Sequence, residues 1–263
     1  MTQTLTDKVV LVTGASRGIG AGIAKVLAQE GARVVIHYNT NKERADEVKR
    51  EVDAYGNHPA CIVQADVGDL TAVNNMIGLV QESFGRLDIL VNNAGTKGPL
   101  GALDAVPLVE LEQVMKTNFW GPVYTTRAAL PLMKENKYGR LVFVSVELVE
   151  RPAIKLAGYA TSKAALNALA RSVAVEYGAD GITANIITPG PTDTDLNHKV
   201  VDIYNTDPSL VRDHFMIPRL APPEAIGEAV AMVCKNPYIT AQNIFVDNGY
   251  QRKYIIPRAR KQP

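Results

Sequence analysis

Short apolar runs alternate with longer amphipathic segments along most of the chain, up to about residue 190. Runs of four to eight residues rich in Val, Ile and Leu are typical of buried strands, and segments with apolar residues every three or four positions are typical of helices. The predicted strands are Lys8–Thr13, Arg33–Tyr38, Ala60–Gln64, Leu87–Asn92, Arg140–Val146, Thr183–Thr188 and Asn243–Val246. The predicted helices include Ile19–Glu30, Lys42–Tyr55, Ala72–Phe84, Leu108–Met133 and Ala160–Tyr177.

This alternation predicts the fold class. Strands that are apolar throughout, each followed by a helix, indicate a parallel sheet covered by helices on both faces. No linker, repeat or low-complexity stretch divides the sequence. We therefore predict one α/β domain spanning residues 1–263.

Two segments depart from the alternation. The stretch 191–223 is long, polar and interrupted by Pro208, Pro218 and the pair Pro222-Pro223. Because it follows the carboxyl end of a strand, where open α/β sheets bind ligands, we expect a substrate lid rather than a plain surface excursion. The tail at 250–263 is basic but lacks interleaved aromatic residues, which favours a solvated or subunit-contacting tail over a nucleic-acid site.

Composition excludes several classes of protein. The 263 residues are 46% hydrophobic and carry a net charge of only +1, so no global charge favours nucleic acid or an anionic membrane. The two cysteines, Cys61 and Cys234, and the four dispersed histidines lack the spacing of a disulfide framework or a metal site. The polar start and the short first apolar run argue against a signal peptide. We expect a soluble, cytosolic, metal-free protein.

A glycine turn follows the first predicted strand and opens the first predicted helix. Glycines at such a place permit a tight turn and let the backbone approach a pyrophosphate at the positive end of the helix. The GxxxGxG spacing differs from the best-known dinucleotide fingerprint, and the turn also matches GxSxG, the nucleophile elbow of hydrolases. An elbow on the first strand is out of place in that fold, so we favour a nucleotide. The predicted contacts are Gly14, Ser16, Arg17, Gly18, Ile19 and Gly20.

The end of the second strand indicates which nucleotide binds. An acidic side chain there would accept hydrogen bonds from the ribose 2′-hydroxyl of NAD(H), but the sequence after Tyr38 begins Asn39-Thr40-Asn41-Lys42. Arg17 in the glycine turn is suited to a 2′-phosphate, helped by Asn39, Asn41 or Lys42, and Tyr38 is a further predicted cofactor contact. We therefore predict NADP(H) in preference to NAD(H).

Tyr159 and Lys163 lie one helical turn apart, so their side chains share a helix face. That spacing alone is common. Beside a nucleotide site, however, a phenol next to a fixed cation can transfer a proton while the nicotinamide transfers a hydride.

Six motifs in order along almost the whole chain resemble the short-chain dehydrogenase/reductase family, in its single-domain branch. They are Thr13-GASRGI-Gly20, Ala65-Asp66-Val67, Asn92-Asn93-Ala94-Gly95, Asn118, Tyr159-ATS-Lys163, and Pro189-Gly190 followed by Thr194. The likeness extends to 3-oxoacyl-ACP reductase-like and glucose dehydrogenase-like members. It implies a Rossmann-type doubly wound sheet of about seven parallel strands in the order 3-2-1-4-5-6-7.

The resemblance also implies roles for named residues. Lys163 binds the nicotinamide ribose and lowers the pKa of Tyr159, which donates or accepts the proton. Asn118 holds a water that links Lys163 to solvent. Asp66 and Val67 meet the adenine, and Thr192 and Thr194 meet the carboxamide. The further cofactor contacts that it implies are Asn92, Ala94, Gly95, Pro189 and Gly190.

One position departs from the family pattern. The serine that binds the substrate oxygen lies thirteen residues before the tyrosine in the family, and here that residue is Val146. Ser145 is one residue early, and on an extended strand this shift turns the side chain to the opposite face. Three hypotheses follow: a kink lets Ser145 reach the substrate, Tyr159 works without it, or the site performs other chemistry. Glu147 and Glu150 follow, where the family commonly has small residues.

The resulting prediction is an NADPH-dependent enzyme that reduces a carbonyl of a small to medium-sized, partly apolar substrate, or oxidises the alcohol. The alternatives are an imine or enoyl reductase, an isomerase or a cyclase on the same fold, and a non-catalytic NADP(H)-binding protein. The resemblance further implies a homo-oligomer, a tetramer or dimer, paired through the helices Leu108–Met133 and Ala160–Tyr177.

Overall fold

Seven parallel strands form one sheet in the order β3-β2-β1-β4-β5-β6-β7, as the resemblance implies. The computed structural model describes residues 3–55, 58–194 and 216–250. Most of the predicted lid and nearly all of the basic tail therefore lie outside the described residues. The strands are β1 (Val9–Val12), β2 (Arg33–Tyr38), β3 (Cys61–Gln64), β4 (Ile89–Asn92), β5 (Gly139–Val144), β6 (Ile182–Pro189) and β7 (Asn243–Val246).

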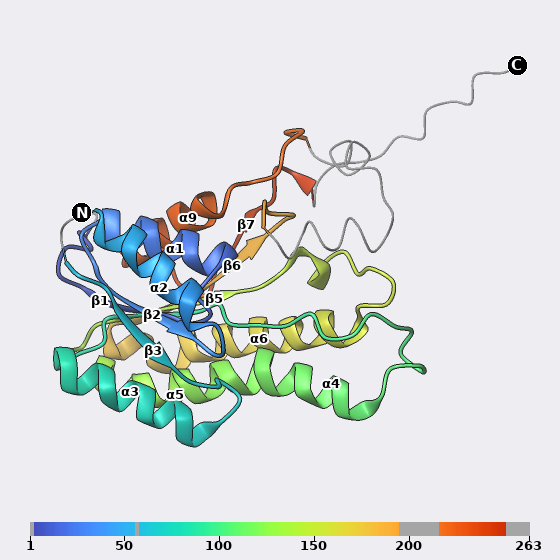
Figure 1. Cartoon of the computed structure of the whole chain (residues 1–263), viewed down its shortest axis with the longest axis horizontal. Coiled ribbons are helices and arrows are strands. Elements are labelled where there is room, and N and C mark those ends of the chain that lie inside the picture. The colour runs from blue at the N-terminus through green and yellow to red at the C-terminus, as the bar shows by residue number, and fades with distance from the viewer. Residues whose placement is uncertain (1–2, 56–57, 195–215, 251–263) are drawn as a thin grey trace, which may run out of the picture.

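Helices cover both faces of this sheet (Figure 1). One layer contains α1 (Gly18–Gln29), α2 (Lys42–Asp53) and α9 (Pro223–Lys235). The other contains α3 (Leu70–Phe84), α4 (Leu108–Met115), α5 (Gly121–Glu135) and α6 (Ala157–Tyr177). The short helical turns are η1 (Lys116–Trp120), η2 (Glu147–Val149) and η3 (Gly178–Asp180).

The strands divide their side chains between two apolar cores. Val10 and Val12 of β1 pack with α1, α2 and α9, whereas Val9 and Leu11 pack with the α3, α5 and α6 layer. Successive side chains of a strand point to opposite faces, so a fully apolar strand is what two covered faces require. The strands are apolar throughout because helices cover both faces of the sheet.

The sequence analysis missed α9. This helix begins with Pro223 in its first turn and buries Ile226, Val230 and Val233 against the sheet. It crosses α1 closely: a Cβ added to Gly22 would lie 2.5 Å from the carbonyl carbon of Pro223. The apolar spacing of this helix is present in the sequence, but the helix begins at the end of the proline-rich stretch that we predicted to be an irregular lid.

The predicted helix Leu108–Met133 is one helical run with an altered middle. The run passes from α4 through η1, a π-helical turn, into α5. A π turn adds a residue to the helical turn and changes the direction of the side chains around it. Asn118, a predicted site residue, lies in this turn and is fully buried.

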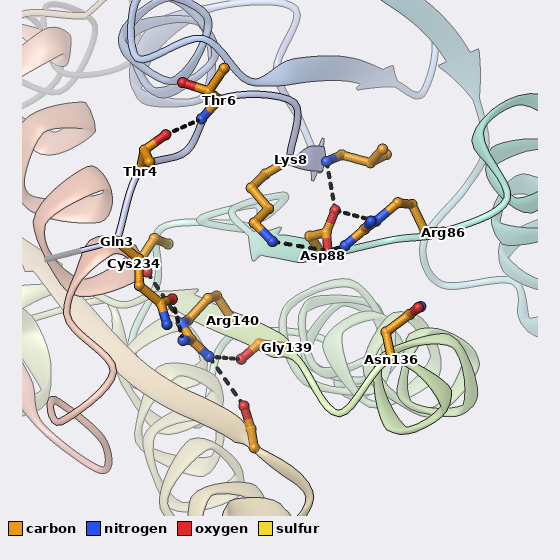
Figure 2. A network of polar contacts seen from close by, with 12 residues as sticks. Gln3, Thr4, Thr6, Lys8, Arg86, Asp88, Asn136, Gly139, Arg140 and Cys234 are labelled. Carbon is orange, nitrogen blue, oxygen red and sulfur yellow. Dashed lines mark hydrogen bonds and ion pairs between the residues drawn. The ribbon is translucent and has the colours of Figure 1, made fainter. Parts of the chain in front are cut away.

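Charged side chains connect several strands at the amino-terminal edge of the sheet (Figure 2). Asp88 accepts hydrogen bonds from the Val9 amide at 2.9 Å and from Arg86 Nε at 2.8 Å. Arg140 donates to the carbonyl oxygens of Cys234 at 3.1 Å and Gly181 at 3.2 Å, and to Gln3 Oε1 at 3.0 Å. Each of these buried charges is satisfied, which fixes the amino edge and leaves the carboxyl edge for ligands.

Among the described helices, none combines the length and apolar character needed to cross a lipid bilayer.

Candidate active site

The loop from β1 to α1 forms the predicted glycine turn. Gly14 and Gly18 have φ angles of 63° and 55°, in the left-handed region that glycine adopts without strain. A Cβ on Gly20 would lie only 2.4 Å from the Gly14 carbonyl oxygen, so no other residue fits there. Arg17 occupies the N-cap of α1 in an extended conformation without a side-chain cap. The first amide groups of α1 are therefore available to a phosphate, and the cradle fits a dinucleotide.

The loop after β4 is bonded to this turn. The Thr13 hydroxyl accepts hydrogen bonds from the Asn93 and Ala94 amides at 2.9 and 3.0 Å. The Asn93 side chain donates to the carbonyl oxygens of Thr13 and Gly14 at 2.8 and 3.1 Å. These contacts hold the Asn92–Gly95 motif and the glycine turn as one unit.

His37 supports the turn from beneath. Its Nδ1 accepts a hydrogen bond from the Gly14 amide at 2.9 Å, and its Nε2 lies 3.0 Å from the Ala65 carbonyl oxygen. This pair of contacts requires the neutral ring with its proton on Nε2. Burial lowers the pKa of His37 to about 4, which keeps the ring neutral near pH 7. His37 thus joins the glycine turn to the loop that carries Asp66.

Some of the predicted cofactor residues after β2 already have side-chain partners within the protein. Asn41 caps α2, accepting from the Arg44 amide at 2.9 Å, and Lys42 pairs with Asp46 at 2.7 Å. Asn39 is exposed, whereas Tyr38 is buried. Within residues 3–55, 58–194 and 216–250, the exposed Arg17 side chain makes no hydrogen bond or ion pair.

Two of the other predicted cofactor residues have structural partners. Asp66 Oδ1 accepts from the Gly68 amide at 2.8 Å, which shapes the loop after β3. Asn92 is buried, and its side chain bonds the hydroxyls of Thr125 at 2.6 Å and Thr126 at 3.1 Å. Asn92 therefore fixes α5 to the end of β4 through its side chain.

The loop after β6 faces the glycine turn. Gly190 donates its amide to Val246 at 3.0 Å, and the Thr192 hydroxyl donates to the Gly190 carbonyl at 2.9 Å. A Cβ added to Gly18 would lie 3.4 Å from Thr194 Cγ2. The structure thus brings together the predicted phosphate and carboxamide contacts, with Pro189 at the end of β6.

Asn118 links the β4 loop to α6. Its Oδ1 accepts from the Thr96 amide and its Nδ2 donates to the Thr96 carbonyl, both at 2.8 Å. The same Nδ2 donates to Ser162 Oγ at 3.0 Å, and Ser162 donates to the Tyr159 carbonyl at 2.7 Å. Both hydrogens of the Asn118 amide have protein acceptors. The side chain fixes the position of the helix that carries Tyr159.

Lys163 lies under the centre of the site. The side chain is 3% exposed, and Nζ donates a hydrogen bond to the Val144 carbonyl at 2.7 Å. A Cβ added to Gly95 would lie 3.5 Å from Nζ and 3.2 Å from Asn118 Oδ1. Burial lowers the pKa of Lys163 to about 8. The Lys163 ammonium therefore lies between the Asn92–Gly95 loop and the end of β5.

The pKa of Tyr159 differs from the sequence-based expectation. We expected Lys163 to lower it, but burial raises it, and the nearby Glu147 carboxylate raises it further. The expected direction was wrong because the desolvation of a phenolate cannot be read from a sequence. The phenol stays protonated at neutral pH.

Ser145 and Val146 end the β5 segment. The Ser145 amide still bonds the Ile187 carbonyl at 2.8 Å, continuing the sheet one residue past β5. The Ser145 hydroxyl is buried and has no hydrogen-bond partner among the described residues. It therefore makes no bond to Tyr159, whose hydroxyl likewise has no partner within the described part of the chain.

Glu147 and Lys97 complete the surroundings of Tyr159. Burial raises the pKa of the Glu147 carboxyl to about 7, while Lys97 and Arg151 act against that rise. Lys97 is partly buried, and burial lowers its pKa. The sequence analysis missed Lys97 and gave His37 no role. The position of Lys97, two residues after the NNAG motif, was the only signal for it.

No group of three or more potential metal ligands occurs within the described ranges.

Comparison with known proteins identifies the family. The family model for short chain dehydrogenases matches residues 8–205. This chain belongs to the short-chain dehydrogenase/reductase family. Oxidoreductase UcpA of Salmonella typhimurium is 36% identical over 257 residues, covering 93% of this chain and 95% of its own. The 3-oxoacyl-[acyl-carrier-protein] reductase of Synechocystis is 34% identical, covering 93% and 97%.

Solved structures agree with the family. A putative short-chain alcohol dehydrogenase from Sinorhizobium meliloti superposes with a TM-score of 0.87 at 30% identity, covering 94% of this chain and 97% of that one. The protein is therefore an oxidoreductase of the short-chain dehydrogenase/reductase type, and members of this family bind a nicotinamide cofactor. The glycine turn described above fits such a cofactor.

Proposed function

We propose that the protein transfers a hydride between NADP(H) and a carbonyl or alcohol carbon of a partly apolar substrate, with Tyr159 as the proton donor or acceptor. One observation carries the proposal: Tyr159 and Lys163 share a face of α6, and Lys163 Nζ bonds Val144 beside Gly95. Both residues lie near the carboxyl edge of the sheet, the edge that also carries the glycine turn, and this supports the proposal.

The raised pKa of Tyr159 suits the direction of reduction. A phenol that stays protonated at neutral pH can give its proton to a carbonyl oxygen as negative charge develops there. Lys163 holds a positive charge beneath the site below about pH 8. Its remaining N–H groups are suited to the hydroxyls of the nicotinamide ribose.

NADP(H) is proposed over NAD(H) because of the charge pattern after β2. The four residues after Tyr38, Asn39-Thr40-Asn41-Lys42, include no acid to accept hydrogen bonds from a 2′-hydroxyl, and Arg17 is exposed in the glycine turn. A guanidinium binds a phosphate through two parallel hydrogen bonds.

Val146 leaves the substrate oxygen without the donor that the family commonly supplies. Removing one such donor typically lowers the rate by a factor of about 10² to 10³ without abolishing it. Tyr159 can therefore support reduction by itself. The alternative is a related reduction, of an imine or an enone, at the same site.

The test is NADPH oxidation against a panel of ketones, imines and enones. We expect Tyr159→Phe to lower kcat/KM by about 10² or more while nucleotide affinity is kept. Tyr238→Phe is the matched control, because Tyr238 is 87% exposed and lies in the loop between α9 and β7. Unchanged turnover in Tyr159→Phe would remove the proton-donor role. The variants Val146→Ser and Ser145→Ala, assayed in the same way, show whether Ser145 donates a hydrogen bond to the substrate oxygen or whether that donor is absent.

We also propose a homo-oligomer, a tetramer or dimer, that pairs through the helices containing Leu108, Trp120 and Val175. These side chains are 75%, 47% and 82% exposed. Apolar groups exposed on adjoining helices favour burial against another subunit. Light scattering after size exclusion measures the mass, and a monomer at micromolar concentration would contradict the proposal.

A further inference from the structure

A hollow beside Tyr159 has an unusual charge pattern. Its enclosed volume is about 10 Å³, and about 260 Å³ when the space open to solvent is counted. Three segments line it: the loop after β4, α4, and the start of α6. The lining residues are Lys97, Pro99, Gly101, Leu103, Val106, Leu111, Val114, Lys155, Ala157, Gly158 and Tyr159. The hollow is apolar except for two lysines and the phenol, and its lining contains no acidic residue.

Lys97 is the deeper of the two cations. The ammonium is partly withdrawn from water, and within the described ranges no hydrogen bond or ion pair compensates this loss. Glu147 acts on it electrostatically without lining the hollow. Taking a charge out of water is unfavourable unless a partner replaces the water. An anion bound in the hollow would be such a partner.

Lys155 lies at the opposite wall with its backbone in the left-handed region, at φ 64°. A lysine rarely adopts this conformation, and it persists only where the surroundings enforce it. The Gly101 amide donates to the Lys155 carbonyl at 3.2 Å, which joins the two walls. This bond holds an exposed second cation at the rim of the hollow.

We propose that Lys97, assisted by Lys155, binds a carboxylate on the substrate, so that the substrate is an oxo acid or, in reverse, a hydroxy acid. This inference rests on the proposed function, because it places the acid group of the substrate beside Tyr159. A single deep cation among apolar walls suits a monoanion on an apolar body better than a phosphate dianion, particularly because Glu147 opposes added negative charge nearby.

The test compares each oxo acid with its own ester. We would measure kcat/KM for benzoylformate and methyl benzoylformate, and for acetoacetate and ethyl acetoacetate, in wild type, Lys97→Met and Lys97→Arg. Hydrogen bonds to charged groups contribute enough that the acid-to-ester ratio should fall about 10- to 100-fold in Lys97→Met. Lys97→Arg should restore part of the ratio because it keeps the charge. Lys155→Met should lower the ratio by less.

Lys134→Met at the far end of α5 is the control and should leave the ratio unchanged. An equal ratio in wild type and Lys97→Met would overturn the proposal. A calorimetric titration of benzoylformate into the protein with NADP⁺ separates the two proposals. If no carbonyl compound is turned over, the proposed function fails. If benzoylformate nevertheless binds to wild type and not to Lys97→Met, the carboxylate site is still supported. If Lys97→Met binds benzoylformate as tightly as wild type does, the carboxylate site is overturned.

Discussion

The imidazole of His37 bonds the amide of Gly14, at 2.9 Å, and reaches the carbonyl of Ala65 with its other nitrogen, at 3.0 Å. One neutral side chain thus joins the glycine turn to the loop after β3, two loops of the proposed nucleotide site. Because a protonated ring has no acceptor for the Gly14 amide, this geometry exists only while His37 is uncharged.

Stability should therefore depend on pH through His37. The pKa is about 6.5 in the unfolded chain and about 4 in the folded protein, so the unfolded state binds the extra proton first. The contribution is fully present above pH 6.5 and is lost as pH falls toward 4, by up to about 3 kcal/mol. Urea unfolding between pH 8 and 4 measures it. In His37→Asn, this part of the pH dependence should disappear; His58→Asn, at a partly exposed position, is the control.

The Asn118 contacts predict a coupled loss of stability and activity. Asn118→Ala leaves the Thr96 amide and carbonyl without their partner, which should lower the free energy of unfolding by about 1–3 kcal/mol. Because Ser162 then loses its donor, the start of α6 should shift and kcat should fall. Asn185→Ala, which removes a comparable buried amide beside β7, should lower stability but keep kcat. Equal kcat values for the two variants would contradict a positioning role for Asn118.

Lys163 predicts an alkaline limit to activity. With a pKa of about 8 it is charged below that pH and neutral above it. If its ammonium binds the nicotinamide ribose, kcat/KM for NADPH should fall as pH rises through about 8. Lys163→Met should lower kcat/KM strongly at pH 7 and show no such fall. A wild-type profile that is flat from pH 7 to 9 would contradict this role.

The raised pKa of Glu147 predicts that its contribution to stability decreases as pH rises, whereas the contribution of a carboxylate in an ion pair increases. Its folded pKa of about 7 lies above the ordinary value of 4.5, so the folded state keeps a proton that the unfolded state releases. The contribution of Glu147 to the free energy of unfolding should be fully present below pH 4.5 and should be lost as pH rises toward 7, by up to about 3 kcal/mol. Other charges that act on this carboxyl are Lys97, Arg151 and Asp247. Glu147→Gln should be more stable than wild type at pH 8, as urea unfolding at pH 8 and 5 would show; Glu228→Gln on the exposed face of α9 is the control.

Arg17 predicts the choice of nucleotide. In Arg17→Ala, the Kd for NADPH should rise by about 10- to 100-fold, because a charge-assisted contact with the 2′-phosphate is lost. The Kd for NADH should change little. Fluorescence titration with the two nucleotides gives both values. Arg50→Ala, on the exposed side of α2, is the control, and an equal loss for NADPH and NADH would show that Arg17 only shapes the turn.

The sequence predicted the fold because the fold depends on periodic patterns. The apolar strands, the helices between them and the glycine turn are local signals, and the π turn at Asn118 altered the long helix without changing its extent. The pKa of Tyr159 and the contacts of His37 and Lys97 depend on burial by distant segments. No local pattern carries that information, so these features required the structure.

The contacts of Asp88 and Arg140 hold the strands together at the edge opposite the active site. The loops at the carboxyl edge take no part in these contacts. We therefore expect residues 98–106, which leave Thr96 and its bonds to Asn118 in place, to be exchangeable with the corresponding segment of relatives, so that new substrate preferences could be grafted onto an unchanged frame.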